Sequence, residues 1–175
     1  MSYLWQKTSF SKEELKEIAT SLDTMNLEAL TTLGLFYAHG YYDYPVSCDQ
    51  ATKILNIAMS KKHAQAFYVY AGLVLLDSFK GQLDESKSVA YLRKSAELGF
   101  DLAMAKLGEF YLDGIGLKVN YRDAERWLIK ARSESAIPGL KRLISYYQNL
   151  GYNDKVLELK DYVNKFTDIQ PMKIS

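Results

Sequence analysis

The sequence predicts an all-α protein: a right-handed α/α solenoid of about three to four helix-pair repeats with an N-terminal capping helix. Three observations support this prediction. Glycines recur at near-constant intervals, at Gly34, Gly72 and Gly108. Each interval contains a second segment whose small and apolar residues keep helical spacing. The 175 residues include only three prolines, which suits a chain built mainly of helices.

The first predicted element is a capping helix that runs from residue 11 to residue 22. Ser11 and Glu14 have the spacing of a capping box, in which both side chains bond backbone amides at the start of a helix. Its apolar face would carry Leu15, Ile18, Ala19 and Leu22. We assign residues 1–25 to an N-terminal arm and this helix, which would cover the open end of the solenoid. The alternative is a mobile arm that folds on a partner through Tyr3, Leu4, Trp5 and Phe10.

The first helix of each repeat carries a pattern around its glycine. The pattern is Leu33-Gly34-x-x-Tyr37-x-x-Gly40, then Ala71-Gly72-x-x-Leu75, then Leu107-Gly108-x-x-Tyr111-x-x-Gly114. Glycine inside a helix costs about 1 kcal/mol relative to alanine. Its recurrence therefore predicts a close approach of the next helix, which a Cβ would obstruct. We expect a positive φ at the glycines that end these helices, Gly40, Gly114 and Gly116.

The second helix of each repeat keeps one face with the spacing i, i+3, i+4 and i+7. The three sets are Ala51, Ile54, Leu55 and Ala58; Ser88, Tyr91, Leu92 and Ser95; and Ala124, Trp127, Leu128 and Ala131. These sets recur at nearly the same interval as the glycines. Both helices therefore repeat together.

A degenerate fourth unit follows the third. Its first helix would begin near Pro138 and contain Leu143 and Tyr147. Gly151 suits the end of that helix, and Asn153 suits the next N-cap. The second helix would bury Val156, Leu159, Val163 and Phe166. We therefore assign residues 26–166 to the repeats and residues 167–175 to a C-terminal tail.

The third unit carries a family resemblance. Its residues are Ala103, Leu107, Gly108, Tyr111, Gly114-Ile115-Gly116-Leu117, Asn120, Ala124, Trp127, Leu128 and Ala131. They resemble the Sel-one-like repeat, a relative of the tetratricopeptide repeat, and the resemblance extends over roughly residues 27 to 165. It implies an α/α solenoid whose known members mostly serve as adaptors and scaffolds. It carries over no catalytic residue, because the motif positions are structural.

One loop departs from this pattern. Residues 40–45, Gly-Tyr-Tyr-Asp-Tyr-Pro, replace the usual Gly-x-Gly turn, and the loop is one residue longer than its counterpart in the third unit. Tyrosine combines an apolar ring with a polar tip and is enriched in protein interfaces. Tyr41, Tyr42 and Tyr44 are therefore candidate partner-binding residues.

Further candidates follow if the first helices line a concave groove, as in the tetratricopeptide relatives. They are Leu35, His39, Leu73, Asp77, Glu109, Asp113 and Lys141. The three carboxylates among them would gather near the middle of the groove as an acidic patch facing a basic partner. The alternative is a hydrolase that uses these carboxylates, which would need one of them with a raised pKa in a closed pocket.

Composition and spacing argue against several other functions. Lys plus Arg (22) nearly balances Asp plus Glu (21), and no basic stripe predicts nucleic-acid binding. His39, His63 and Cys48 lack metal-ligand spacing, and Gly114-x-Gly116 lacks the rest of a phosphate-loop motif. We therefore predict no metal and no cofactor. No signal peptide and no apolar stretch of ~20 residues is visible, which predicts a cytoplasmic protein that does not bind membranes.

Together these features predict a non-catalytic protein-protein interaction module, a monomer or weak dimer that binds one protein partner. Its small size favours a bacterial immunity protein that neutralises a toxin. The alternative is a general adaptor, scaffold or regulator in signalling.

Overall fold

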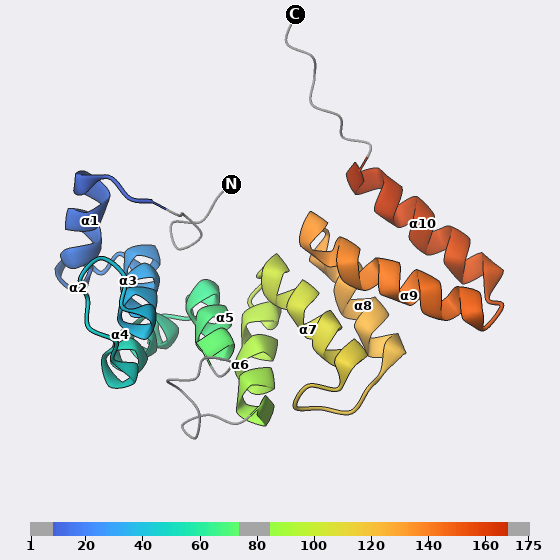
Figure 1. Cartoon of the computed structure of the whole chain (residues 1–175), viewed down its shortest axis with the longest axis horizontal. Helices are drawn as coiled ribbons and strands as arrows, with labels where there is room; N and C mark the ends of the chain where they lie inside the picture. Colours follow the sequence, from blue (N-terminus) through green and yellow to red (C-terminus); the bar gives the residue numbers. More distant parts are fainter. Residues whose placement is uncertain (1–8, 74–84, 168–175) are drawn as a thin grey trace, which may run out of the picture. The chain divides into compact units, whose positions relative to one another are not determined.

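The computed structural model describes residues 9–73 and 85–167, and the regular secondary structure of these ranges is entirely helical (Figure 1). The elements are α1 (Lys12–Ala19), α2 (Ser21–Thr24), α3 (Leu27–His39), α4 (Cys48–Ser60), α5 (Ala64–Leu73), α6 (Glu85–Glu97), α7 (Asp101–Asp113), α8 (Tyr121–Ala131), the 3₁₀ helix η3 (Glu134–Ala136), α9 (Ile137–Asn149) and α10 (Asn153–Thr167). The chain forms two compact units, Met1–Gly99 and Phe100–Ser175.

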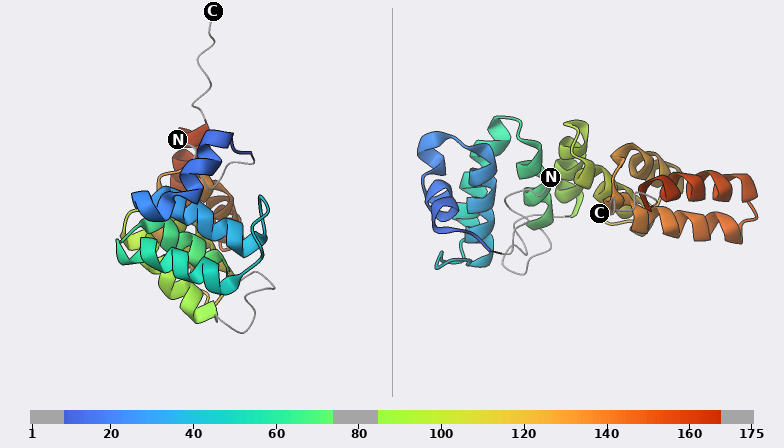
Figure 2. Two further views of the ribbon diagram at one scale, coloured as in Figure 1. Left: turned by 90° about the vertical axis from the view of Figure 1, so that its left-hand side faces the viewer. Right: turned by 90° about the horizontal axis from the view of Figure 1, so that it is seen from above.

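The long helices pack as consecutive pairs within each unit. In the first unit α3 packs on α4 and α5 packs on α6; in the second unit α7 packs on α8 and α9 packs on α10. Figure 2 shows α9 and α10 running side by side. The predicted all-helical fold of serial helix pairs is confirmed in the described residues.

The N-terminal capping helix is shorter than predicted. The capping box of residues 11–14 is formed, but α1 ends at Ala19 and the chain turns at Thr20 before the single turn of α2. The Thr20 hydroxyl donates to carbonyls of the last turn of α1, and such bonds end a helix. Ile18 is fully buried as predicted, whereas Ala19 and Leu22 are exposed. The expectation of one continuous apolar face to Leu22 is therefore wrong, because the helix axis breaks between them.

A constant interval of 37 residues relates the buried positions of α3, α5 and α7. The sets of equivalent buried positions are Ala29, Ala66 and Ala103; Leu33, Tyr70 and Leu107; Gly34, Ala71 and Gly108; and Phe36, Leu73 and Phe110. All members of these sets are buried. The repeat is therefore more regular than the glycine spacing indicated.

The predicted register of the second repeat is off by one residue. A Cβ on Gly108 would lie 2.5 Å from Leu128 Cγ, and one on Gly34 would meet a leucine of α4 at 2.7 Å, so both glycines permit close helix packing as predicted. A Cβ on Gly72 would meet no atom of the described residues within 4 Å. Gly72 is exposed, and the buried Ala71 occupies the close-approach position instead.

Two serines replace alanines on the buried face of α6. The Ser88 hydroxyl donates to the Ala71 carbonyl and the Ser95 hydroxyl donates to the Ala64 carbonyl, each at 2.6 Å. Buried hydroxyls need such partners, since an unpaired one costs about 1–3 kcal/mol. The predicted face of α6 is therefore buried, and its two serine hydroxyls donate to carbonyls of α5.

The fourth helix pair is also confirmed. Pro138 lies in the first turn of α9, and Gly151 ends the turn after it with a φ of 76°. The predicted apolar face of α10 buries Val156, Leu159 and Val163 and partly buries Phe166. Asn153 is the first residue of α10.

Among the described residues, none of the helices combines the length and the apolar character that crossing a membrane requires.

Candidate functional site

The tyrosine loop, residues 40–47 between α3 and α4, presents aromatic side chains to solvent. The exposed fraction is 52% for Tyr41 and 40% for Tyr42, and Tyr44 is partly buried. The structure therefore brings the three tyrosines predicted from the sequence together on one short segment.

The tyrosine loop is held at both ends like its counterpart in the second unit, residues 114–120. Each loop begins at a left-handed glycine, Gly40 or Gly114, with a φ of 71° and an amide that donates to the last turn of the preceding helix at 2.8 Å. Each ends at an N-cap residue, Ser47 or Asn120, whose amide donates to a carbonyl of the preceding helix at 2.8 or 2.9 Å. The two loops are therefore equivalent parts of the repeat.

The extra residue of the tyrosine loop changes its backbone. Tyr42 (φ 53°) and Asp43 (φ 65°) both adopt the left-handed region, where the shorter loop uses Gly116 (φ 64°). A side chain other than glycine costs about 1–2 kcal/mol per residue in this region. The predicted departure of this loop from the repeat is confirmed, and surrounding contacts must hold its strained backbone.

Aromatic packing supplies those contacts. The Phe36 ring of α3 lies 5.4 Å from Phe10, 5.0 Å from Tyr42 and 5.6 Å from Tyr44, measured between ring centroids. Tyr44 also packs edge-on against Tyr37 at 5.0 Å. Such pairs contribute about 0.5–1.5 kcal/mol each beyond their buried area. Phe10 thus packs on the loop, while Tyr3, Leu4 and Trp5 lie outside the described residues.

His39 extends the aromatic surface. Its ring stacks on Tyr41 with centroids 5.0 Å apart and planes 6° from parallel. Burial lowers the pKa of His39 below its ordinary value, so the imidazole is neutral at pH 7. The stacked pair therefore offers a flat and uncharged face next to Tyr42.

The structure changes the role of one predicted groove residue in the first unit. Leu73 is 2% exposed and belongs to the hydrophobic core, so its prediction as a partner-binding residue is wrong. The error follows from the one-residue shift in register, because Leu73 is the counterpart of the buried Phe36. Leu35 is partly buried against the same core. Asp77 lies outside the described residues.

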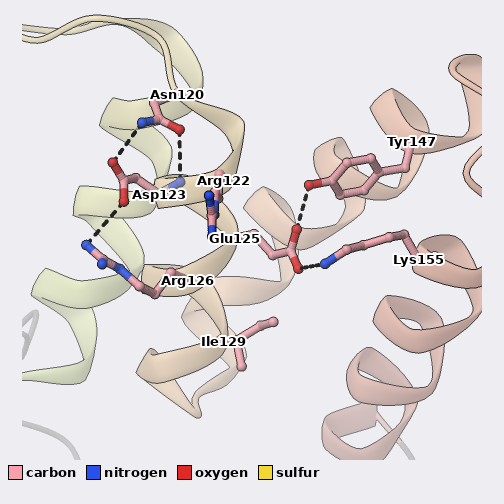
Figure 3. Close-up of a pocket in the computed structure, with 8 residues that line it drawn as sticks. All are labelled: Asn120, Arg122, Asp123, Glu125, Arg126, Ile129, Tyr147 and Lys155. Atoms are coloured by element: carbon pink, nitrogen blue, oxygen red, sulfur yellow. Dashed lines mark hydrogen bonds and ion pairs between the residues drawn. The ribbon is translucent and has the colours of Figure 1, made fainter.

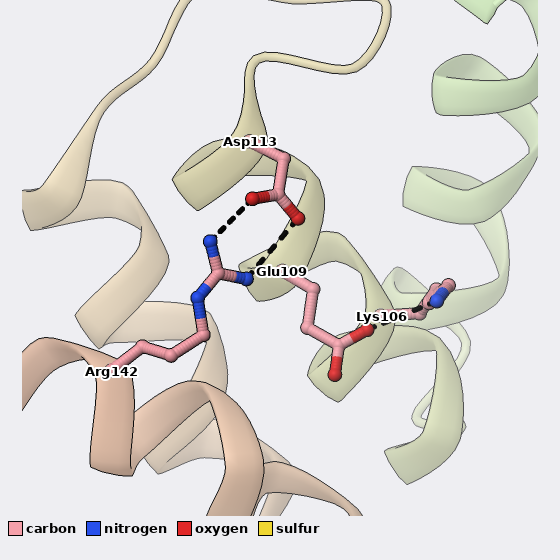
Figure 4. Close-up of polar contacts among 4 residues, drawn as sticks. All are labelled: Lys106, Glu109, Asp113 and Arg142. Carbon is pink, nitrogen blue, oxygen red and sulfur yellow. Dashed lines mark hydrogen bonds and ion pairs between the residues drawn. The ribbon is translucent and has the colours of Figure 1, made fainter.

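The two predicted carboxylates of α7 are both paired (Figure 4). Glu109 accepts from Lys106 at 3.0 Å, and Asp113 accepts both terminal nitrogens of Arg142 from α9, one of them at 3.2 Å. The hydrogen bond from this guanidinium is the main cause that holds the pKa of Asp113 below its ordinary value. The predicted acidic patch is therefore largely neutralised by its own unit. Lys141 is exposed on α9.

A cleft of about 910 Å³ in the second unit was not predicted (Figure 3). It is lined by Asn120, Arg122, Asp123, Glu125, Arg126, Ile129, Tyr147 and Lys155. Glu125 is only 9% exposed, accepts the Tyr147 hydroxyl at 2.5 Å and forms an ion pair with Lys155. The sequence holds one signal for this cleft, because a carboxylate, Glu125, directly follows the buried Ala124. The two partners of Glu125 lie 22 and 30 residues further along the chain, so no local pattern identifies them.

The Glu125–Tyr147 bond predicts a pH dependence of stability. Burial, and then the bond to Glu125, raises the pKa of Tyr147 well above its ordinary value. An unfolded tyrosine loses its proton near pH 10, whereas the folded one keeps it, so the free energy of unfolding falls as pH rises above about 10.

Tyr147→Phe should remove this dependence. At pH 7 the variant is expected to be less stable by about 1 kcal/mol, since one hydrogen bond is lost. Urea unfolding at pH 7 and at several values above pH 10 measures the difference, with the exposed Tyr152→Phe as control. Equal slopes in Tyr147→Phe and the unsubstituted protein would contradict the prediction.

No group of three or more His, Cys, Asp or Glu side chains able to hold a metal ion occurs in the part of the chain that the structure describes. Cys48 is the first residue of α4, directly after the N-cap Ser47.

Comparison with known proteins found a family model and solved structures to which parts of this chain are similar. The model of the Sel1 repeat matches residues 70–100 and 101–134. A crystal structure of a Sel1 repeat protein from Oxalobacter formigenes is similar, with a TM-score of 0.58, 24% identity, and coverage of 75% of this chain and 97% of that one. A protective antigen of uropathogenic Escherichia coli strains that displays an SLR fold is similar with a TM-score of 0.61 and 22% identity, covering 91% of this chain and 37% of that one.

Similarity in sequence extends to a curated protein of known name. Chitin synthase regulatory factor 3 of Schizosaccharomyces pombe is 29% identical over 143 residues, which cover 78% of this chain. This chain spans 15% of the length of that relative.

Proposed function

This chain carries two tandem Sel1 repeats, and on that basis we propose that it is a non-catalytic protein-protein interaction module whose partner binds at the tyrosine loop. The observation that carries the proposal is the exposure of Tyr41 and Tyr42 on a loop whose base is fixed by hydrogen bonds and aromatic packing. The repeat positions themselves are occupied by packing residues. The tyrosine loop, which interrupts the repeat pattern, is therefore the best candidate for the binding surface.

The geometry of the loop favours binding. Aromatic anchors contribute much of the binding energy in protein interfaces. Tyr42 is already held by Phe36, and Tyr41 by its stack on His39, so little side-chain entropy remains to be lost on binding. The loop therefore suits a partner that presents an apolar or aromatic patch of its own.

Among the roles predicted from the sequence, we favour an adaptor or regulator. A relative described as a regulatory factor supports this choice, although the match spans only a small part of that protein. The immunity role stays a prediction, and so do the cytoplasmic location and the monomeric or weakly dimeric state. Rescue of growth by co-expression with a toxin encoded nearby would test the immunity role directly.

The hydrolase alternative finds no support in the two described groove carboxylates, Glu109 and Asp113. A general acid needs a raised pKa, whereas Arg142 lowers the pKa of Asp113. Glu109 is partly buried and paired with Lys106 on the same helix. We therefore keep the non-catalytic proposal.

Removing the two exposed rings should abolish partner capture. We expect Tyr41→Ala with Tyr42→Asn to capture at least about tenfold less of the native partner, because loss of aromatic anchors costs more than ~1.4 kcal/mol. Asparagine adopts the left-handed φ of Tyr42 more readily than most residues, so this substitution adds no backbone strain at that position. Affinity purification with quantitative mass spectrometry identifies and measures the partner.

Leu157→Ser is the matched control, since it removes another exposed apolar side chain, on α10. It should capture the partner as the unsubstituted protein does. Full capture by a double variant with normal helical circular dichroism would move the binding surface away from the loop.

A further inference from the structure

The cleft of the second unit is walled on one side by a single face of α8. Arg122, Glu125, Arg126 and Ile129 are spaced i, i+3, i+4 and i+7, so they are neighbours on that face, and all line the cleft (Figure 3). Tyr147 of α9 and Lys155 of α10 line it as well. Three cationic side chains thus face two carboxylates.

Most of these charges are already paired. Arg126 bonds Asp123 at 3.1 Å, and the two oxygens of Glu125 are taken separately by Tyr147 and Lys155. Arg122 is exposed and has no counterion among the described residues. Its nearest helical neighbour of opposite charge, Glu125, is fully engaged elsewhere. The cleft therefore contains one guanidinium whose charge remains available to a ligand.

A row of tyrosines adjoins the cleft. Tyr121 stacks on Tyr146 with centroids 3.7 Å apart, Tyr146 lies 5.4 Å from Tyr147, and Tyr147 lies 6.1 Å from Tyr152. Tyr152 ends this tyrosine row and is 57% exposed. The available cation lies in the cleft, and the exposed Tyr152 ring lies beside Tyr147, which lines the same cleft.

We propose that this cleft binds an acidic segment of a protein partner, with a Glu or Asp carboxylate on the Arg122 guanidinium and an adjacent apolar side chain on Tyr152. Guanidinium and carboxylate match in planar, bidentate geometry, and aromatic rings accept apolar side chains. Arg126 and Lys155 are paired with Asp123 and Glu125, so the cleft offers a ligand the charge of Arg122 alone, which suits an isolated carboxylate better than a polyanion such as nucleic acid.

The residues of this cleft are different from those of the tyrosine loop. The proposal rests on the proposed function only because it takes the partner to be a protein. The probe is a fluorescent ten-residue peptide with one glutamate next to one leucine among glycine and serine residues, and the control peptide carries glutamine in place of that glutamate. Fluorescence anisotropy with the full chain measures both. We expect the glutamine peptide to bind about tenfold more weakly, since one charge-assisted bond is worth roughly 1.5–3 kcal/mol.

Variants assign the binding to this cleft. Arg122→Glu is expected to lower the affinity for the glutamate peptide at least about tenfold, and Tyr152→Ser is expected to lower it about fivefold. Lys53→Glu makes the same charge change at an exposed position of the first unit and should bind like the unsubstituted protein, as should Tyr41→Ala with Tyr42→Asn. Amide chemical-shift changes should centre on residues 120–129 and 147–155.

Three results would overturn the proposal. Arg122→Glu could bind the glutamate peptide as tightly as the unsubstituted protein does, or the unsubstituted protein could bind both peptides equally. It could also bind a twenty-nucleotide single-stranded DNA more tightly than the glutamate peptide. If Arg122→Glu loses its helical circular dichroism, Arg122→Gln provides the same comparison. Because the loop variants keep this cleft intact, their loss of partner capture tests the proposed function independently.

Discussion

Gly108→Ala is expected to lower the free energy of unfolding of the second unit by about 2–3 kcal/mol, the cost of overpacking a core. The added Cβ would lie 2.5 Å from Leu128 Cγ and 3.2 Å from the Ala124 carbonyl oxygen. The leucine is held on its other side by Gly139, so it cannot move away freely. The helices α7 and α8 must therefore separate, and the gain in helix propensity of about 1 kcal/mol is outweighed.

Gly72→Ala is the matched control with the opposite sign. On Gly72 of α5 the same added methyl group meets no atom of the described residues within 4 Å, so helix propensity decides the effect and the protein should gain about 0.5–1 kcal/mol. Chemical denaturation, with hydrogen exchange of the amides in each unit, measures both variants. If Gly108→Ala and Gly72→Ala changed the free energy of unfolding to a similar extent, Gly108 would not be a close-approach position.

Phe36→Ala is expected to destabilise the first unit by about 3–5 kcal/mol, the usual cost of removing a buried aromatic side chain. The ring contacts Phe10, Tyr42 and Tyr44, so its removal also frees the strained loop backbone. Partner capture at the tyrosine loop should fall with it. The milder Phe36→Leu keeps the unit folded if the alanine variant unfolds.

Phe110→Ala tests whether the loop effect is specific. Phe110 occupies the equivalent position in α7 and is equally buried, so a similar loss of stability is expected, but in the second unit. Capture through the tyrosine loop should remain, because Phe110 belongs to the second unit and the loop to the first. If Phe36→Leu and a folded Phe110 variant reduced capture equally, general destabilisation would explain the effect.

Part of the candidate site was accessible from the sequence. The tyrosine loop was predicted because it interrupts a repeat whose other positions are explained by packing. Its left-handed Tyr42 and Asp43 were not predicted, since a non-glycine residue adopts that region only when tertiary contacts compensate the strain. Leu73 was misassigned because a shift of one residue on a helix moves a side chain by about 100° around the axis.

The sequence by itself determined the features that depend on local interactions. The helices, the near-constant repeat, the capping box at residues 11–14 and the left-handed Gly40 and Gly114 all follow from residues a few positions apart. Only the tertiary structure decided which charges remain available. Glu125 meets Tyr147 and Lys155 because three helices converge there, and that convergence leaves Arg122 without a counterion in the described residues. Contacts between residues so distant in the chain leave no local pattern from which they could be predicted.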